Sequence, residues 1–135
     1  MRYLLDTCVI SDFIKGYPDL RDRFLKVPPD DVAISTVTQM EIHYGLLLHK
    51  EQTKKLRRPI QSLLESLHIL PLTSEDAEYA AKIRVDLRKK GIPIGPYDLL
   101  LAGTALSRDL IFVTSNEKEF SRVQNLKLEN WNQRN

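Results

Sequence analysis

Apolar and polar positions alternate along this chain in two different patterns. Short apolar runs bounded by polar or turn residues are typical of buried strands, whereas apolar residues three and four positions apart are typical of amphipathic helices. The runs that predict strands are residues 3–5, 32–35, 68–72, 110–114 and a short segment near 126–128. The segments that predict helices are residues 8–16, 18–27, 35–50, 53–67, 74–90 and 96–109, with one further turn after residue 116.

Residues with special backbone preferences set the ends of these helices. Gly16 and Gly91 stand where two helices are expected to end, because glycine readily adopts the left-handed conformation found there. Thr73 or Ser74 is expected to cap the helix that runs to Lys90. Pro59 interrupts the apolar pattern of residues 53–67, so this helix is expected to be kinked or split in two.

Strand and helix segments follow one another in alternation throughout the chain. This alternation favours an α/β fold with a parallel sheet, because parallel strands require crossover connections, which are usually helices. The chain contains no repeat, no linker and no low-complexity stretch. We therefore expect a single domain over residues 1–135.

Composition narrows the classes of protein that fit this pattern. The 135 residues are 42% hydrophobic and 28% charged, as in an ordinary globular domain. No segment approaches the roughly 20 apolar residues of a membrane span, and Asp6 and Asp12 make the start too acidic for a signal peptide. A lone cysteine, Cys8, suits a reducing compartment. A cytoplasmic location without membrane contact is expected, and the net charge of +2 permits a nucleic-acid partner without requiring one.

Four acids fall where the predicted strands end or the following helices begin. They are Asp6, Glu41, Asp98 and Glu119. In open parallel sheets the carboxyl ends of the strands form the ligand-binding edge, so these carboxylates are expected to face one another. Such a group is destabilised by mutual repulsion unless protons or a cation offset it, and all-oxygen ligands suit Mg²⁺ or Mn²⁺. Together with the lack of a catalytic histidine pattern, this predicts metal-assisted hydrolysis of a phosphodiester.

Each acid also has a purely structural interpretation. Asp6 is placed to cap the helix that begins near Cys8, and Glu41 is placed to complete a capping box with Thr38. Asp98 would stabilise the N-terminus of its helix electrostatically, and Glu119 taken alone is an ordinary surface acid. The spacing leaves both interpretations open.

Longer stretches of sequence carry a resemblance to a known family. The segments LLDTCVISDFIKG, ISTVTQMEIHYG, IRVDLRKKGIPIGPYDLLLAGTAL and IFVTSNEKEF, followed by LENW, resemble the PIN-domain ribonuclease toxins of bacterial type II toxin–antitoxin systems, the VapC family. The resemblance implies a three-layer α/β/α PIN-like domain with a central, mostly parallel sheet of four to five short strands. It implies that Mg²⁺ or Mn²⁺ is bound by catalytic acids at Asp6, Glu41, Asp98 and Glu119, supported by Thr7, Thr114 and Asn116.

The resemblance also implies an activity and partners. The expected protein is a metal-dependent endoribonuclease that hydrolyses RNA, with tRNA a candidate substrate. Its expected partners are a cognate antitoxin, operator DNA only through that antitoxin, and a second copy of the chain, with apolar residues around 40–67 contributing to the homodimer. Two positions depart from the common family pattern. Cys8 stands where many relatives have Asn or Ser, and Glu119 stands where Asp is commoner, which leaves direct metal contact by Glu119 open.

Two other functions fit parts of the sequence. A PIN-like module that binds RNA or protein without cutting would also have this fold. The absence of one of the four acids would favour such a module, but all four are present. A phosphoacceptor receiver domain would require an acid closing a middle strand, which residues 32–35 and 68–72 lack.

The remaining polar and aromatic residues have ordinary interpretations beside functional ones. His43, His49 and His68 show no metal-ligand spacing and are expected at the surface. Trp131 is expected to be a packing anchor. Basic residues in two stretches, 50–58 and 88–90, either cover solvated helix faces or contact RNA phosphates.

Overall fold

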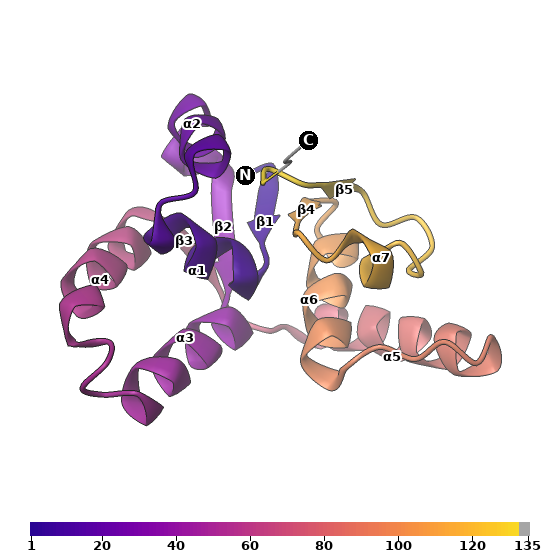
Figure 1. The fold of residues 1–135 in the computed structure, drawn as a ribbon. Helices are drawn as coiled ribbons and strands as arrows, with labels where there is room; N and C mark the ends of the chain where they lie inside the picture. Colours follow the sequence, from indigo (N-terminus) through magenta and orange to yellow (C-terminus); the bar gives the residue numbers. More distant parts are fainter. Residues whose placement is uncertain (133–135) are drawn as a thin grey trace.

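The computed structural model describes residues 1–132 and contains one parallel sheet with helices on both faces. Its strands are β1 (Tyr3–Leu5), β2 (Val32–Ser35), β3 (His68–Leu70), β4 (Ile111–Val113) and β5 (Leu128–Glu129). Their order is β3-β2-β1-β4-β5, and every neighbouring pair is parallel. The predicted α/β fold with a parallel sheet is confirmed, and β1 lies at its centre (Figure 1).

Helices connect consecutive strands and cover the sheet. They are α1 (Thr7–Lys15), α2 (Pro18–Lys26), α3 (Thr36–Leu48), α4 (Arg57–Ser66), α5 (Ser74–Lys89), α6 (Pro96–Ser107) and α7 (Glu117–Phe120), with short 3₁₀ turns η1 (Pro29–Asp31) and η2 (Lys54–Leu56). Figure 1 shows α1, α2 and α4 toward one side of the sheet and α5, α6 and α7 toward the other. Among residues 1–132, no helix has the length and apolar character that crossing a membrane requires.

The side chains of β1 point alternately into the two hydrophobic cores on either side of the sheet. Tyr3 and Leu5 pack into the core formed with α1, α2 and α4, whereas Leu4 packs into the core formed with α5 and α6. Successive side chains of a strand point to opposite faces, so a strand buried on both faces has a continuous apolar sequence. This is why the three apolar residues before Asp6 predict a central strand.

Most of the expected helix boundaries agree with the structure. Gly16 ends α1 with a φ of 84°, and Gly91 follows α5 with a φ of 70°. Thr73 caps α5, and Asp76 completes a capping box by accepting a hydrogen bond from the Thr73 N–H at 3.0 Å. Such reciprocal bonds satisfy backbone donors that have no partner within the helix.

The helix expected over residues 53–67 is split in two, as predicted, but the division does not lie at Pro59 itself. The apolar pattern of residues 53–67 is divided before the proline, between η2 and α4, and α4 begins at Arg57. Pro59 therefore lies in the first turn of α4, where a missing N–H removes no intrahelical hydrogen bond. The last strand is also displaced slightly, to Leu128–Glu129 from the expected region of 126–128.

The C-terminal segment is held against the first core by Trp131, which is 5% exposed. Its ring meets those of Tyr3 and Phe24 edge to face, with centroids 5.1 and 6.0 Å apart. Edge-to-face contact is a favourable arrangement for aromatic rings. The expected packing role of Trp131 is confirmed.

Helix α6 is fixed tightly against α5, and this contact sets the position of Asp98 in the first turn of α6. A Cβ atom added at Gly103 would lie 2.8 Å from the backbone nitrogen of Ala80 and the backbone oxygen of Asp76. The two helices are therefore too close at this point for any residue larger than glycine. At the far end of α6, Arg108 donates to the buried carboxylate of Asp76 at 3.0 Å, and Ser107 donates to it as well. Burial raises the pKa of Asp76, but the hydrogen bonds from Arg108 and Ser107 outweigh it and hold this pKa below its ordinary value.

Candidate metal centre

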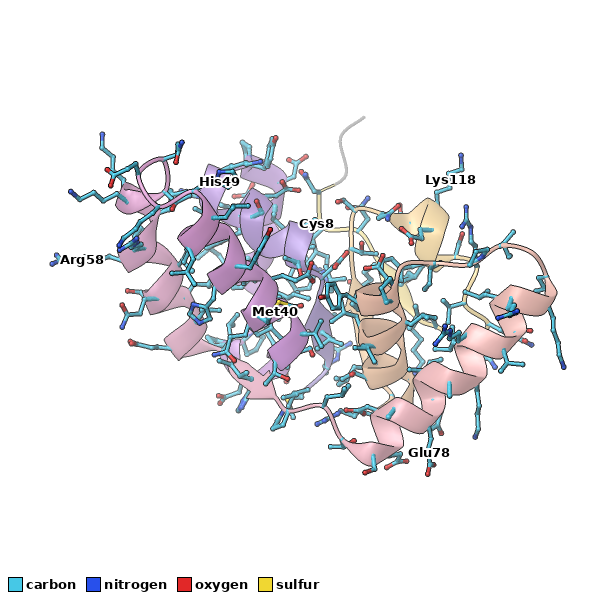
Figure 2. The ribbon with its side chains drawn as sticks, turned by 90° about the horizontal axis from the view of Figure 1, so that it is seen from below. Cys8, Met40, His49, Arg58, Glu78 and Lys118 are labelled. Carbon is cyan, nitrogen blue, oxygen red and sulfur yellow. The ribbon has the colours of Figure 1, made fainter. Side chains whose placement is uncertain are left out.

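The carboxyl ends of β1, β2 and β4 lie side by side, and each leads into a site residue. Asp6 follows β1 directly, β2 leads into the helix that carries Glu41, and β4 leads through Thr114 to Glu119. Asp98 enters from the N-terminus of α6. We refer to these four acids, Asp6, Glu41, Asp98 and Glu119, as the acid cluster. Figure 2 views the molecule from this edge of the sheet and labels Cys8, which lies 3.4 Å from the Asp6 carboxylate.

Asp6 is the most deeply buried member, with 7% of its surface exposed. Its carboxylate accepts hydrogen bonds from the Thr7 N–H at 2.8 Å and the Thr114 hydroxyl at 2.8 Å. Burial raises the pKa of Asp6, hydrogen bonds from Thr114 and other donors lower it in part, and the charge of Glu119 raises it further. Asp6 is thus the N-cap of α1 and also a member of the acid cluster, so its two interpretations are compatible.

Glu41 is positioned by Thr7 rather than by a capping box. The Thr7 hydroxyl lies 2.9 Å from a Glu41 carboxylate oxygen and 3.2 Å from the Thr38 hydroxyl. The alternative in which Thr38 and Glu41 form a capping box is wrong, because Ser35 caps α3 by accepting from the Val37 N–H at 3.0 Å. Glu41 lies beyond the first turn of α3, so its carboxylate is available to the cluster.

Asp98 and Glu119 face each other across the opening of the cluster. Glu119 accepts hydrogen bonds from the Asn116 amide and from the Gly95 N–H, the latter at 3.4 Å. Burial, together with the charges of Glu119, Asp6 and Glu41, raises the pKa of Asp98 to about 7. A carboxyl group with that pKa holds a proton in a substantial fraction of molecules at neutral pH. The four carboxylates are therefore close enough to repel one another.

Neighbouring polar residues complete this part of the fold. Thr114 also accepts a hydrogen bond from the Asn116 N–H at 2.9 Å, so it links Asp6 to the loop before α7. Cys8 lies 3.4 Å from Asp6 and 3.3 Å from the Ser115 hydroxyl, and burial followed by the charge of Asp6 raises its pKa. Cys8 is half-buried rather than fully buried. Its neighbour Ser115 was not predicted as a site residue, although its place directly after Thr114 was a usable signal.

Two groups of residues are not part of the cluster. Glu117, the other acid of α7, accepts a hydrogen bond from the Asn130 amide at 3.3 Å. His43 and His49 are exposed, and His68 lies 3.7 Å from the exposed carboxylate of Asp30. The expectation that the histidines lie at the surface is confirmed.

The donor chemistry of the cluster fits a hard divalent cation, but the side-chain placement does not by itself define one. All four acids offer carboxylate oxygens, and their mutual repulsion would be relieved by positive charge. Within residues 1–132, however, no group of three or more His, Cys, Asp or Glu side chains is placed so that it could hold a metal ion. As placed, Asp6, Glu41 and Glu119 are held by protein donors rather than gathered at one point. The argument for a cation therefore rests on charge and donor type.

Comparison with known families identifies the class of this domain. Residues 3–126 match the model of the PIN domain family. Curated relatives align over almost the whole length of both chains. The chain is 33% identical over 132 residues to the tRNA(fMet)-specific endonuclease VapC of Salmonella typhimurium and 35% identical to that of Shigella flexneri, covering 97% of this chain and 98% of each relative. It is 33% identical to ribonuclease VapC2 of Rickettsia felis.

Solved structures give the same answer. The chain superposes on DNA-bound VapBC of Salmonella typhimurium with a TM-score of 0.86 at 34% identity, covering 97% of this chain and 98% of that chain. It superposes on VapBC2 of Rickettsia felis, bound to a fragment of its promoter, with a TM-score of 0.87 at 32% identity, covering 97% and 99%. The chain belongs to the PIN-domain family and, within it, to the VapC group. The three-layer PIN fold implied by the sequence motifs is confirmed.

Proposed function

We propose that this protein is the toxin of a type II toxin–antitoxin pair and an endoribonuclease that hydrolyses phosphodiester bonds in RNA at the acid cluster. One observation carries the proposal. Four carboxylates from separate segments lie at the carboxyl edge of the sheet, near enough for the charges of three to raise the pKa of the fourth, Asp98, in a chain that matches ribonucleases over nearly its full length. A module that only binds RNA gains nothing from a mutually repelling group of acids, because these acids would also repel the anionic RNA.

The proposal includes Mg²⁺ or Mn²⁺ as the cofactor, bound by Asp6, Glu41, Asp98 and Glu119. A divalent cation at these acids would supply the positive charge that favours attack of water on a phosphodiester and stabilises the charge that then develops. The raised pKa of Asp98, about 7, and the all-oxygen donor set support this assignment. Glu119 has one carboxylate oxygen bonded to Asn116 and the other 3.4 Å from Gly95 N, so its part in binding is the least direct.

The remaining site residues orient these acids. Thr114 and the Thr7 N–H fix the Asp6 carboxylate from two sides, and the Thr7 hydroxyl fixes Glu41. Asn116 holds Glu119 from the preceding turn. These hydrogen bonds matter because a catalytic group that is out of position contributes much less to the reaction rate. With a pKa of about 7, Asp98 is partly protonated at neutral pH, and a cation bound beside it would favour its ionised form.

The relatives indicate substrate and partners. The Salmonella and Shigella proteins are named as tRNA(fMet)-specific endonucleases, and we extend tRNA as the substrate to this chain. The VapBC structures support a cognate antitoxin for this chain. A segment of that antitoxin across the acid cluster, and operator binding through the antitoxin, are further parts of the proposal. We place the protein in the cytoplasm, where RNA and a reduced Cys8 are both expected.

A homodimer is also part of the proposal, and the structure narrows the surface that would form it. The apolar residues of α4 are core residues, since Ile60, Leu63 and Leu64 are at most 9% exposed. The apolar stripe of α3 is instead open to solvent: Met40, Tyr44, Leu47 and Leu48 are 41 to 72% exposed. Exposed apolar patches of this kind commonly mark protein interfaces. Light scattering of a Leu47→Asp/Leu48→Asp variant tests this, with a monomer expected.

Growth of cells that express the chain without an antitoxin tests the proposed activity. Wild-type protein should arrest growth, whereas Asp6→Asn, which keeps the shape of the side chain but removes its charge, should not. Both proteins must be soluble at equal level, and the variant should still bind the antitoxin. A soluble Asp6→Asn variant that arrests growth as strongly as wild type would contradict the nuclease assignment and favour a non-catalytic RNA- or protein-binding module.

A further inference from the structure

The connection between α3 and α4 carries the densest positive charge in the chain. Residues 50–58 contain five cations and one acid, Glu51, so their formal charge is +4, while that of the whole chain is +2. The rest of the molecule is therefore net negative, at −2. We call these five cations the basic tip: Lys50, Lys54, Lys55, Arg57 and Arg58. A polyanion approaching the protein is attracted first to such a concentrated region.

The charges of the basic tip are available to a ligand. Four of its five side chains are exposed, and Arg57 is half-buried. None of the ion pairs found within residues 1–132 involves the tip. The second basic stretch differs, because Lys90 is paired with Asp86 at 3.0 Å. The tip therefore offers five cations within nine residues, none of them engaged in an ion pair of the described chain.

The tip is also held in a defined shape. The Thr53 N–H and hydroxyl both donate to the His49 carbonyl, at 3.0 and 2.8 Å, and the Leu56 N–H donates to the Thr53 carbonyl at 2.8 Å. These bonds join the end of α3 to η2 without a loose loop between them. A preorganised cationic surface loses less conformational entropy on binding than a mobile one.

Helix α3 connects the tip to the acid cluster. Glu41 lies on α3, and His49 is eight residues further on, which corresponds to about 12 Å along a helix axis. Figure 2 shows α3 leading from Met40 to His49, with Arg58 at the same end of the molecule and Lys118 at the opposite end. An RNA strand cut at the cluster would have phosphates within reach of the tip a few nucleotides away from the cut.

We propose that the basic tip binds backbone phosphates of the RNA substrate away from the scissile bond and thereby positions the RNA over the acid cluster. This inference rests on the proposed ribonuclease function and adds a binding surface to it. Contacts of this type orient nucleic acid without reading its sequence. An acidic protein segment is the alternative occupant. RNA is favoured because residues 50–58 combine five cations with one acid, and because the exposed apolar residues beside them, Leu47 and Leu48, belong to the proposed dimer surface.

Binding of a fluorescently labelled tRNA transcript tests the proposal, measured by anisotropy in EDTA at 50 to 200 mM KCl. The test variant is Lys54→Gln/Lys55→Gln/Arg57→Gln/Arg58→Gln, and glutamine suits the helical positions because its helix propensity is close to that of Arg and Lys. The matched control is Lys82→Gln/Arg84→Gln/Arg88→Gln/Lys89→Gln on α5, which removes the same charge from four exposed positions. A Lys54→Arg/Lys55→Arg variant tests whether charge alone suffices.

The tip variant should weaken RNA binding at least tenfold at 50 mM KCl and should reduce the salt slope by about 0.7 for each phosphate that the variant no longer neutralises. Cleavage should show a raised KM with little change in kcat, because the tip is remote from the reacting bond. The control and the Lys54→Arg/Lys55→Arg variants should bind like wild type. Equal weakening by the α5 control, or RNA binding unchanged in the tip variant while antitoxin binding is abolished, would overturn the proposal.

Failure of this inference and failure of the proposed function give different results. If the wild-type chain binds RNA through the tip but cuts nothing, the nuclease assignment fails and the binding surface stands. If the chain cuts RNA and the tip variant binds and cuts as wild type does, the binding surface fails and the nuclease assignment stands.

Discussion

Replacing Asp98 by Asn should stabilise the protein at neutral pH in the absence of divalent cations. Burial and the charges of Glu119, Asp6 and Glu41 raise the pKa of Asp98 from its ordinary value of 3.8 to about 7. The folded state therefore retains a proton on Asp98 at pH values where the unfolded chain has released it. Asparagine keeps the size of the side chain and removes the charge, so the repulsion disappears.

The size of the effect follows from the change in proton affinity. At about 1.36 kcal/mol for each tenfold change, the full difference between 3.8 and about 7 sets a ceiling of roughly 4 kcal/mol. Asp98 is only half-buried, and solvent screens its interactions, so we expect about 1–2 kcal/mol of repulsion at pH 7.5. Asn also gives up about 0.3–1 kcal/mol of favourable interaction with the N-terminus of α6. The net gain in unfolding free energy is about 1 kcal/mol.

The pH dependence has a definite sign. At pH values well below 3.8 the carboxyl group is protonated in both the folded and the unfolded state, so it costs nothing. As pH rises from about 4 to about 7 the unfolding free energy of wild type falls relative to that of Asp98→Asn. Urea unfolding in EDTA at pH 5.0 and pH 7.5 measures this difference.

Asp19→Asn is the matched control, because Asp19 also lies in the first turn of a helix that begins with proline but has no part in the acid cluster. It should lose about 0.3–1 kcal/mol at pH 7.5 through the helix dipole alone. An Asp98→Asn variant that loses stability at pH 7.5 as the Asp19→Asn variant does would refute the repulsion argument. Asp98 would then be an ordinary helix-terminal carboxylate.

Two further predictions concern the framework of the site. Thr114→Val removes a buried hydroxyl that donates to Asp6 at 2.8 Å; it should lower the unfolding free energy by about 1–3 kcal/mol, and thermal unfolding that matches wild type would contradict the role of this bond. Gly103→Ala places a methyl group 2.8 Å from the backbone of α5, so the unfolding free energy should fall by about 1–3 kcal/mol. Activity should fall as well, because α6 carries Asp98. The control Gly45→Ala, whose methyl group meets nothing within 4 Å, should not destabilise the protein.

Patterns that reflect burial were the easiest to predict from the sequence. The run before Asp6 is apolar at every position because β1 is covered on both faces, and this alone predicts a central strand. The cap at Thr73 and the glycine ends at Gly16 and Gly91 are local, so they too were visible. The split of the helix near Pro59 was predicted, but not its position, because the amphipathic pattern extends across both η2 and α4 and hides the helix start at Arg57.

The acid cluster was only partly predictable from spacing. That the acids fall near strand ends and helix starts was visible, but which of them meet depends on the strand order, and the sequence does not specify it. Thr7 was expected near the site, yet its bond to Glu41 across 34 positions is a tertiary contact. The apparent capping box of Thr38 and Glu41 shows the limit of local motifs, because Ser35 provides a better-placed cap one turn earlier.

Cleavage of a tRNA transcript by the purified chain is the most direct test of the central claim that the acid cluster catalyses RNA hydrolysis with a divalent cation. With Mg²⁺ or Mn²⁺ the wild-type chain should cut the RNA, EDTA should abolish cleavage, and added cation should restore it. Asp6→Asn should fold and bind the same RNA but leave it uncut under all three conditions. Cleavage that persists undiminished in EDTA, or in the folded Asp6→Asn variant, would contradict this account of the site.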